Sequence, residues 1–274
     1  MLAPALVVIG GLFGGGLADA LAQSFGWFPA LGMHDLELDA WRAVLRDPAI
    51  LHSLLLTLYV AATTTAISTI LAVALALALR GSSARLPMAI LHLPITIPYL
   101  LAAVGITLLV SQSGLLARVI ANLGFIDEPR DFPPLVYDPY AIGIILTYVW
   151  KETPFITLIT LALLRGAPEE LEQVARTLGA TRRQCLRHVI LPRIMSGLLA
   201  AAFVAFAFTF GAFEVPLLLG ETSPPTLPVL AWYEYQSLDL ADRPTAMAVA
   251  LIIAIVTGVL AVVLLRLSRR FFNV

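Results

Sequence analysis

Six long apolar segments constrain this chain more than any other feature of its sequence. A bilayer core needs roughly 20 largely apolar residues per helix, and polar, charged or Pro/Gly-marked breaks separate six such segments. They cover residues 2–24, 50–79, 86–110, 139–163, 194–219 and 245–265. With 59% hydrophobic and only 13% charged residues, a water-soluble fold would expose too much apolar surface. The sequence therefore predicts an all-α polytopic membrane protein with about six transmembrane helices, in one domain over residues 1–274.

Other features narrow the class further. A net charge of −1 argues neither for nucleic acid nor for an acidic substrate. The single cysteine, Cys185, permits no internal disulfide, and its spacing from His188 is not that of metal ligands, so no metal site is expected. Residues 1–24 contain no Lys or Arg, whereas a cleaved signal peptide begins with a basic region. We therefore expect the first segment to be a retained span.

The basic residues predict the orientation, because Lys and Arg accumulate in short loops that stay cytoplasmic. Eleven of the seventeen lie on one side of the predicted spans: Arg80, Arg85, Arg165, Arg176, Arg182, Arg183, Arg187, Arg193, Arg266, Arg269 and Arg270. Both termini are therefore expected in the cytoplasm. The three outer loops, residues 25–49, 111–138 and 220–244, hold twelve of the eighteen acidic residues. They could form a docking surface for an external protein or be solvated loops without a partner.

The cytoplasmic loop over residues 166–193 is more structured than a connector between spans requires. Pro168 suits a first helical turn, and Glu169, Glu170 and Glu172 follow where the helix dipole favours carboxylates. One face of this helix is apolar at i, i+3, i+4 and i+7 spacing: Leu171, Val174, Ala175 and Leu178. We expect a short amphipathic helix that starts at Pro168.

A reversal and a second helix should follow. Gly179 can adopt the left-handed conformation that ends a helix, and Thr181 can cap a helix that runs to Ile190 and is closed by Pro192. The small apolar face of the first helix must pack on neighbouring spans, on lipid headgroups or on another protein. Periodicity alone favours the lipid surface, because basic amphipathic loops commonly lie on anionic lipid.

The loop resembles the EAA loop of ABC-importer permeases, whose pattern is E-A-A-x3-G-x9-I-x-L-P. Gln173-Val174-Ala175 is followed after three residues by Gly179, and after nine more by Val189-Ile190-Leu191-Pro192. Gln173, Val174 and Val189 depart from the pattern, and Glu172 could replace the carboxylate that Gln173 lacks. The resemblance implies a type I permease fold and a loop that seats in a cleft of an ATPase. It assigns coupling to Glu172, Gln173, Ala175, Gly179, Leu191 and Pro192.

Segments outside the loop carry the same resemblance. Residues 53–58, 150–155 and 210–220 look like this class, and the fourth and fifth spans most resemble permeases of the polyamine, ferric-iron, thiamine and aminophosphonate importers. The implied partners are two ATPase subunits that bind ATP and Mg, a second permease that is a different but related chain, and an external solute-binding protein. The implied location is a bacterial cytoplasmic (inner) membrane, and the favoured solute is a polyamine or a similar small charged molecule.

The chain itself has no ATPase motif. A phosphate-binding loop ends in Gly-Lys-Ser/Thr, and the only lysine, Lys151, follows Trp150 inside a predicted span. We therefore expect a transport subunit that is not an enzyme and needs no cofactor of its own.

Ionisable groups at membrane depth are costly and are functional candidates by default. Trp150, Lys151, Glu152, Phe155 and Glu214 could line or gate a translocation pathway. They could equally make polar contacts between helices or subunits. Gly211 and Pro216 near Glu214 predict a break in the fifth span, and Pro154 predicts a disturbed hydrogen bond in the fourth.

Two rival functions use the same residues. A secondary transporter driven by an ion gradient would need intramembrane charges, although no inverted repeat is visible. A channel subunit could pack through its glycine-rich first span. Neither accounts for the structured loop.

Overall fold

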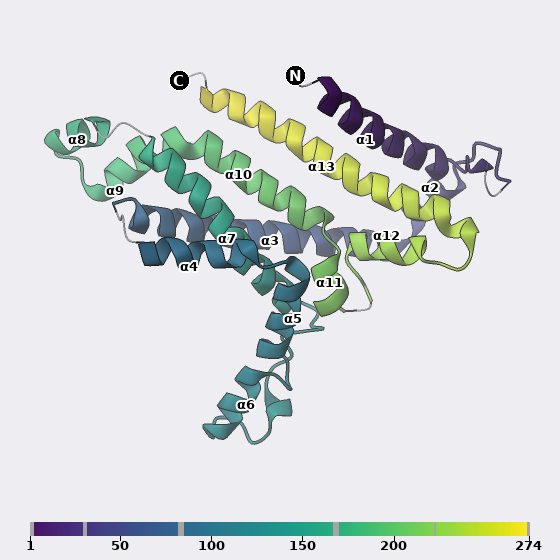
Figure 1. Ribbon diagram of the computed structural model, residues 1–274, viewed down its shortest axis with the longest axis horizontal. Coiled ribbons are helices and arrows are strands. Elements are labelled where there is room, and N and C mark those ends of the chain that lie inside the picture. Colours follow the sequence, from purple (N-terminus) through teal and green to yellow (C-terminus); the bar gives the residue numbers. More distant parts are fainter. Residues whose placement is uncertain (1–2, 30–31, 82–84, 167–169, 222, 273–274) are drawn as a thin grey trace. The chain divides into compact units, whose positions relative to one another are not determined.

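The computed structural model describes residues 3–29, 32–81, 85–166, 170–221 and 223–272, and its regular elements there are helices (Figure 1). Six segments are long and apolar enough to cross a membrane: Leu6–Ser24, Pro48–Leu79, Tyr99–Asn122, Ile142–Arg165, Arg182–Gly211 and Leu240–Val263. The predicted all-α class and the number of spans are confirmed. Four of the segments overlap the predicted ones closely, and the fifth, Arg182–Gly211, shares residues 194–211 with the predicted 194–219.

The third span differs from the prediction. In place of one helix over residues 86–110, the chain forms α4 (Arg85–Thr96) and α5 (Tyr99–Val110), and the third membrane-length segment is Tyr99–Asn122. Pro98 explains the break, since it has no N–H for the carbonyl four residues earlier and its ring disfavours helical geometry at Ile97. The prediction of a single helix over residues 86–110 is wrong, because hydropathy does not detect the missing N–H of Pro98.

The helices form two compact units, residues 1–58 with 222–258, and residues 59–221 with 259–274. The first contains α1 (Ala3–Ser24), α2 (Asp39–Arg46), α12 (Leu227–Tyr235), the start of α3 (Pro48–Leu79) and most of the described α13 (Arg243–Phe272). Its core includes Val44, Leu227 and Val249. The N–H of Leu227 donates to Thr57 Oγ1 at 2.8 Å, which ties α12 to α3.

The second unit is arranged around α7 (Ile142–Arg165), which packs against α4, α5, α10 (Leu191–Gly211) and α11 (Glu214–Leu219). Ile156 and Leu164 are fully buried on α7. α6 (Leu115–Asn122) and the short helix η2 (Pro129–Asp131) follow α5, and this part extends away from the other helices of the unit (Figure 1). α7 therefore carries the fourth-span candidates into the centre of the unit.

The break expected in the fifth span is found, and the fourth span stays helical at Pro154. The fifth span is interrupted where predicted, since α10 ends at Gly211, Ala212 is extended, and α11 begins at Glu214. α7 continues through Pro154 as one helix. A proline removes one hydrogen bond, and packing on several sides can retain the helix.

Candidate functional site

The loop over residues 166–193 contains the predicted helix-turn-helix. α8 (Glu170–Thr177) is followed by Gly179 at φ +87°, and the N–H of Ala180 donates to the carbonyl of Ala175 at 3.0 Å. This is the left-handed helix end expected of glycine. Pro168 and Glu169, which begin the predicted helix, lie outside the described residues.

The second helix begins as predicted but does not end at Pro192. Thr181 and Gln184 form a reciprocal capping box at the start of α9 (Arg182–Cys185). The π-helical segment η3 (Leu186–Ile190) then leads directly into α10. The N–H of Leu191 donates to the carbonyl of Leu186, five residues back. The predicted stop at Pro192 is wrong, because this wider turn accommodates a residue that has no N–H to donate.

The coupling candidates therefore lie on two stretches of backbone. Gln173 is exposed and Ala175 half-buried on α8, while Leu191 and Pro192 lie in the first turn of α10. α9, η3 and α10 form one membrane-length segment, Arg182–Gly211. A displacement of the loop would consequently act on a continuous helical element rather than on a flexible link.

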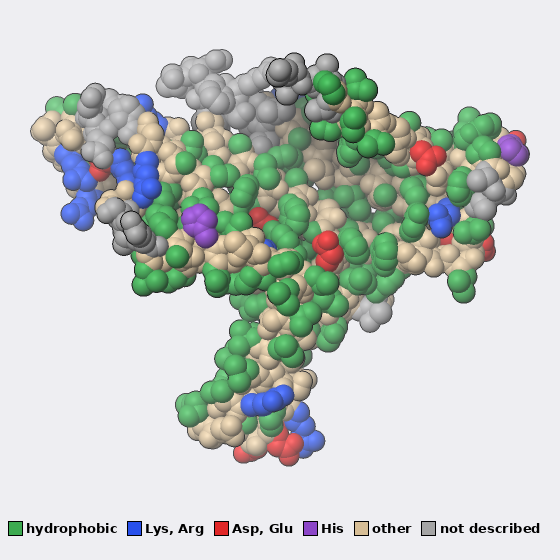
Figure 2. Space-filling model, in the orientation of Figure 1, with side chains coloured by type: hydrophobic (Ala, Val, Ile, Leu, Met, Phe, Trp, Pro, Cys, Tyr) green, Lys and Arg blue, Asp and Glu red, His purple; other side chains and the backbone are tan. Residues whose placement is uncertain are grey.

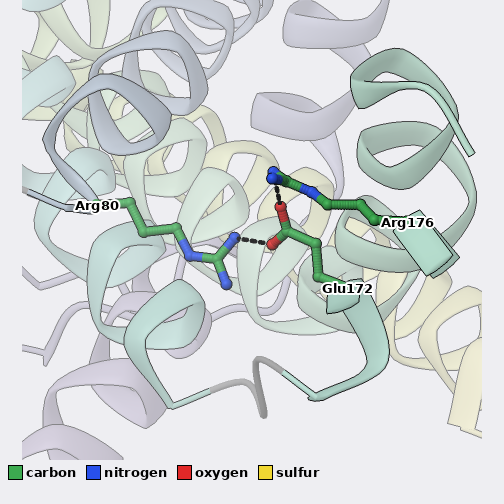
Figure 3. Close-up of polar contacts among 3 residues, drawn as sticks. All are labelled: Arg80, Glu172 and Arg176. Carbon is green, nitrogen blue, oxygen red and sulfur yellow. Dashed lines mark hydrogen bonds and ion pairs between the residues drawn. The ribbon is translucent and has the colours of Figure 1, made fainter. Parts of the chain in front are cut away.

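Glu172 is held by two arginines (Figure 3). Its Oε2 accepts from Arg80 at 2.7 Å, and its Oε1 accepts from Arg176 at 2.6 Å. Arg80 directly follows α3, so the pair joins two elements far apart in sequence, whereas Arg176 lies one turn along α8. Burial alone raises the pKa of the Glu172 carboxyl, but the hydrogen bonds and charges of Arg80 and Arg176 outweigh it and lower the pKa below its usual value.

A cleft of about 660 Å³ surrounds this ion pair. Its lining combines charged and apolar side chains from α3, α8, α9 and η3: Leu77, Arg80, Gly81, Glu172, Gln173, Arg176, Arg182, Leu186 and Ile190. Figure 2 shows basic side chains gathered over α8 and α9. The sequence had placed Arg80 only among the orienting charges, because no local pattern connects it to Glu172.

A second polar cluster lies at the centre of the second unit. Lys151 and Glu152 on α7 are only 4% and 3% exposed. The Lys151 ammonium donates to the carbonyl of Pro94 at 2.5 Å and to that of Ile97, and it lies 4.4 Å from the ring centroid of Tyr99. The Tyr99 hydroxyl donates to Glu152 Oε1 at 2.7 Å. Both α7 residues thus contact the break between α4 and α5.

These residues border a cavity of about 230 Å³. Its lining comes from α4, α5, α7 and α10: Ile95, Tyr99, Lys151, Glu152, Phe155, Val204, Ala205 and Phe208. The structure therefore brings together Lys151, Glu152 and Phe155, three of the five pathway candidates. Tyr99 and Phe208, whose rings are 4.7 Å apart, were not predicted. Pro94 and Pro98 were the sequence signal that could have identified Tyr99, because they mark the helix break that Tyr99 follows.

The other two pathway candidates lie elsewhere. Trp150 lines a separate groove of about 620 Å³ among apolar residues of α3, α4 and α7. Glu214 is half-buried at the start of α11, which packs against α5 and α7, and is not among the lining residues of the 230 Å³ cavity. Adjacent positions on a helix point in different directions, which is why Trp150 separates from Lys151.

Comparison with known proteins gives a family. Residues 66–273 match the family described as "Binding-protein-dependent transport system inner membrane component". The inner membrane ABC transporter permease protein YnjC of Escherichia coli is 31% identical over 219 residues, which cover 78% of this chain and 40% of YnjC. The spermidine/putrescine transport system permease protein PotB of Escherichia coli is 28% identical over 60% of this chain and 58% of PotB. The matched part is thus less than two thirds of either relative.

Solved structures share the fold. A chain from the crystal structure of a bacterial ABC transporter involved in the import of the acidic polysaccharide alginate superposes with a TM-score of 0.80 at 19% identity, covering 98% of this chain and 94% of that one. A second structure of an alginate transporter, in complex with an alginate pentasaccharide-bound periplasmic protein, gives a TM-score of 0.79. At this identity the likeness concerns the fold alone.

Proposed function

This chain belongs to the family of inner membrane components of binding-protein-dependent transport systems, and on that premise we propose that it forms half of the translocation pathway of an ATP-driven importer for a small solute. The observation that carries the proposal is the loop around Gly179: a helix, a left-handed glycine and a second helix that continues into α10. An element of this kind can transmit a rigid displacement from a partner into the membrane.

The energy would come from two ATPase subunits that bind ATP and Mg. In this proposal α8 seats in a surface cleft of one ATPase, and Gln173, Ala175 and Gly179 lie near the contact. Leu191 and Pro192 transmit the motion to α10. Glu172 contributes indirectly, because both of its oxygens are bound by arginines of this chain. Its pair with Arg80 would carry the same motion to α3.

The pathway would include the cavity between α4, α5, α7 and α10. Lys151, Glu152 and Phe155 border it. Trp150 and Glu214 do not line this cavity, and they would act beside it or as parts of a gate. Buried ionisable groups in a membrane segment usually face a bundle interior or a water-filled path. The alternative is that these groups make contacts between helices and do not meet the solute.

The partners and the solute are finer parts of the proposal. We infer an external solute-binding protein, a second permease that differs from this chain, and both termini in the cytoplasm. The name of PotB supports a polyamine such as spermidine or putrescine. Glu152 beside the cavity would suit a cationic solute and Lys151 on the same lining an anionic one, so charge does not decide the solute.

The test is uptake by the assembled importer. The chain is purified with its ATPase subunits, second permease and binding protein and reconstituted into vesicles without an ion gradient. We expect uptake of labelled spermidine that requires both ATP and the ATPase subunits. Uptake driven by an ion gradient without ATPase would instead identify a secondary transporter. If ATP-dependent transport holds for another solute, only the polyamine assignment fails.

A further inference from the structure

The break between α4 and α5 leaves backbone acceptors without their helical partners. In a continuous helix the carbonyl of Pro94 would accept from the N–H of residue 98, but Pro98 has none. The first helical bond into α5 runs from the N–H of Ala102 to the carbonyl of Pro98, at 3.0 Å. The carbonyl of Ile97 therefore precedes the bonded part of α5. At membrane depth such acceptors need another donor.

Lys151 supplies that donor to both carbonyls. Its ammonium has three N–H groups and no acceptor, and it donates to Pro94 and Ile97 from the facing helix α7. Tyr99, the first residue of α5, presents its ring to the same ammonium. A lysine this buried is thus surrounded by the groups that the break exposes.

Glu152 contacts the same break through a different group. Its carboxylate accepts from the Tyr99 hydroxyl at 2.7 Å, and Tyr99 also packs on Phe208 of α10. Two successive residues of α7 therefore fix the last turn of α4 and the first residue of α5. The cavity beside them depends on where this break lies.

We propose that Lys151 is a positioning residue that holds the break between α4 and α5 by binding the carbonyls of Pro94 and Ile97, and that the Glu152–Tyr99 pair is the polar group that meets the transported solute. The solute class this fits is a cation or another donor of hydrogen bonds. The statement about the solute rests on the proposed function, whereas the statement about the break does not.

The test uses hydrogen exchange in the intact importer in lipid nanodiscs, followed over the peptide that covers residues 95–105. In Lys151→Met we expect the amides of that peptide from Ala102 onward, where the helical bonds of α5 begin, to exchange about tenfold faster. Lys151→Arg, which keeps charged donors, should exchange more slowly than Lys151→Met. Pro98→Ala restores an N–H four residues after Pro94, so Lys151→Met with Pro98→Ala should return toward the parental rate.

A matched control is Glu152→Gln, which still offers an oxygen to Tyr99 and should leave exchange over residues 95–105 within about twofold of the parent. In the same samples, Glu152→Gln should reduce stimulation of ATP hydrolysis by the loaded binding protein, with spermidine as the probe. Unchanged exchange in Lys151→Met, or the absence of any rescue by Pro98→Ala, would overturn the positioning role. Normal stimulation in Glu152→Gln would overturn the assignment of Glu152.

A parental importer that spermidine does not stimulate would contradict the polyamine proposal and leave the exchange result standing.

Discussion

Two polar clusters of the second unit use similar residues under different conditions. At the loop, Glu172 and Arg80 are 18% and 19% exposed and pair as opposite charges, with Arg176 more than half exposed. In α7, Lys151 and Glu152 are almost fully buried and bind uncharged partners, two carbonyls and a phenol. Near water a charge pair adds little stability and is adjustable. In a membrane interior a polar group is retained where it satisfies another polar group.

The largest expected effect concerns the loop that contains Glu172. Gly179→Arg places a long side chain on a residue at φ +87°, and we expect the ATPase subunits to stop co-purifying and uptake to stop, with membrane insertion intact. Gly124→Arg is the matched control, since Gly124 has φ +78° and both glycines have open space around them. Its backbone strain should be similar, about 1–2 kcal/mol. Retained co-purification in Gly179→Arg would contradict the role of the loop.

The next effect concerns stability in the buried cluster. Lys151→Met leaves two carbonyls without a donor, and we expect a loss of about 2–6 kcal/mol in the free energy of unfolding, because each buried unsatisfied acceptor costs about 1–3 kcal/mol. Titration with sodium dodecyl sulfate from mixed micelles measures it. The loss should be insensitive to added salt, because Lys151 is almost fully buried and salt screens buried charges little. A salt-dependent loss would show that the ammonium acts through charges near water.

A smaller effect is expected from the ion pair at the loop. In a double-mutant cycle with Arg80→Ala and Glu172→Ala we expect a coupling energy of about 1 kcal/mol that decreases with salt. The corresponding cycle with Arg176→Ala is the control and should give about 0.3–0.5 kcal/mol, the usual range for exposed pairs one turn apart. Equal coupling in both cycles would remove the special link between α3 and α8.

The smallest effect is the pH dependence of that pair. Because the pKa of Glu172 is lowered in the folded protein, its contribution to stability is complete above the unfolded pKa of about 4.3. It is lost only as the pH falls through the lowered folded value. The stability difference between the parent and Glu172→Gln should therefore be equal at about pH 7.5 and about pH 5.5 and decrease at more acidic pH. A difference that disappears between about pH 7 and pH 5 would mean that the pKa is raised.

Sequence patterns predicted the local features of the loop well. Gly179 as a left-handed helix end and Thr181 as a cap depend on residues within a few positions of each other, which is the range of turn and capping preferences. Pro192 was misjudged because its effect depends on the π-helical turn before it. A proline marks where a helix loses a hydrogen bond but does not determine whether the chain continues through it.

The sequence by itself determined the helical membrane class, the number of spans and the loop with its glycine reversal, because hydropathy, length and capping are local properties of the chain. Tertiary structure decided which polar residues meet. Arg80 reaches Glu172 across 92 positions, and Lys151 reaches Pro94 across 57. These pairings depend on how helices pack, and residue spacing along one helix cannot predict them. The same packing placed Trp150 in an apolar groove and its neighbour Lys151 beside the cavity that Tyr99 and Glu152 border.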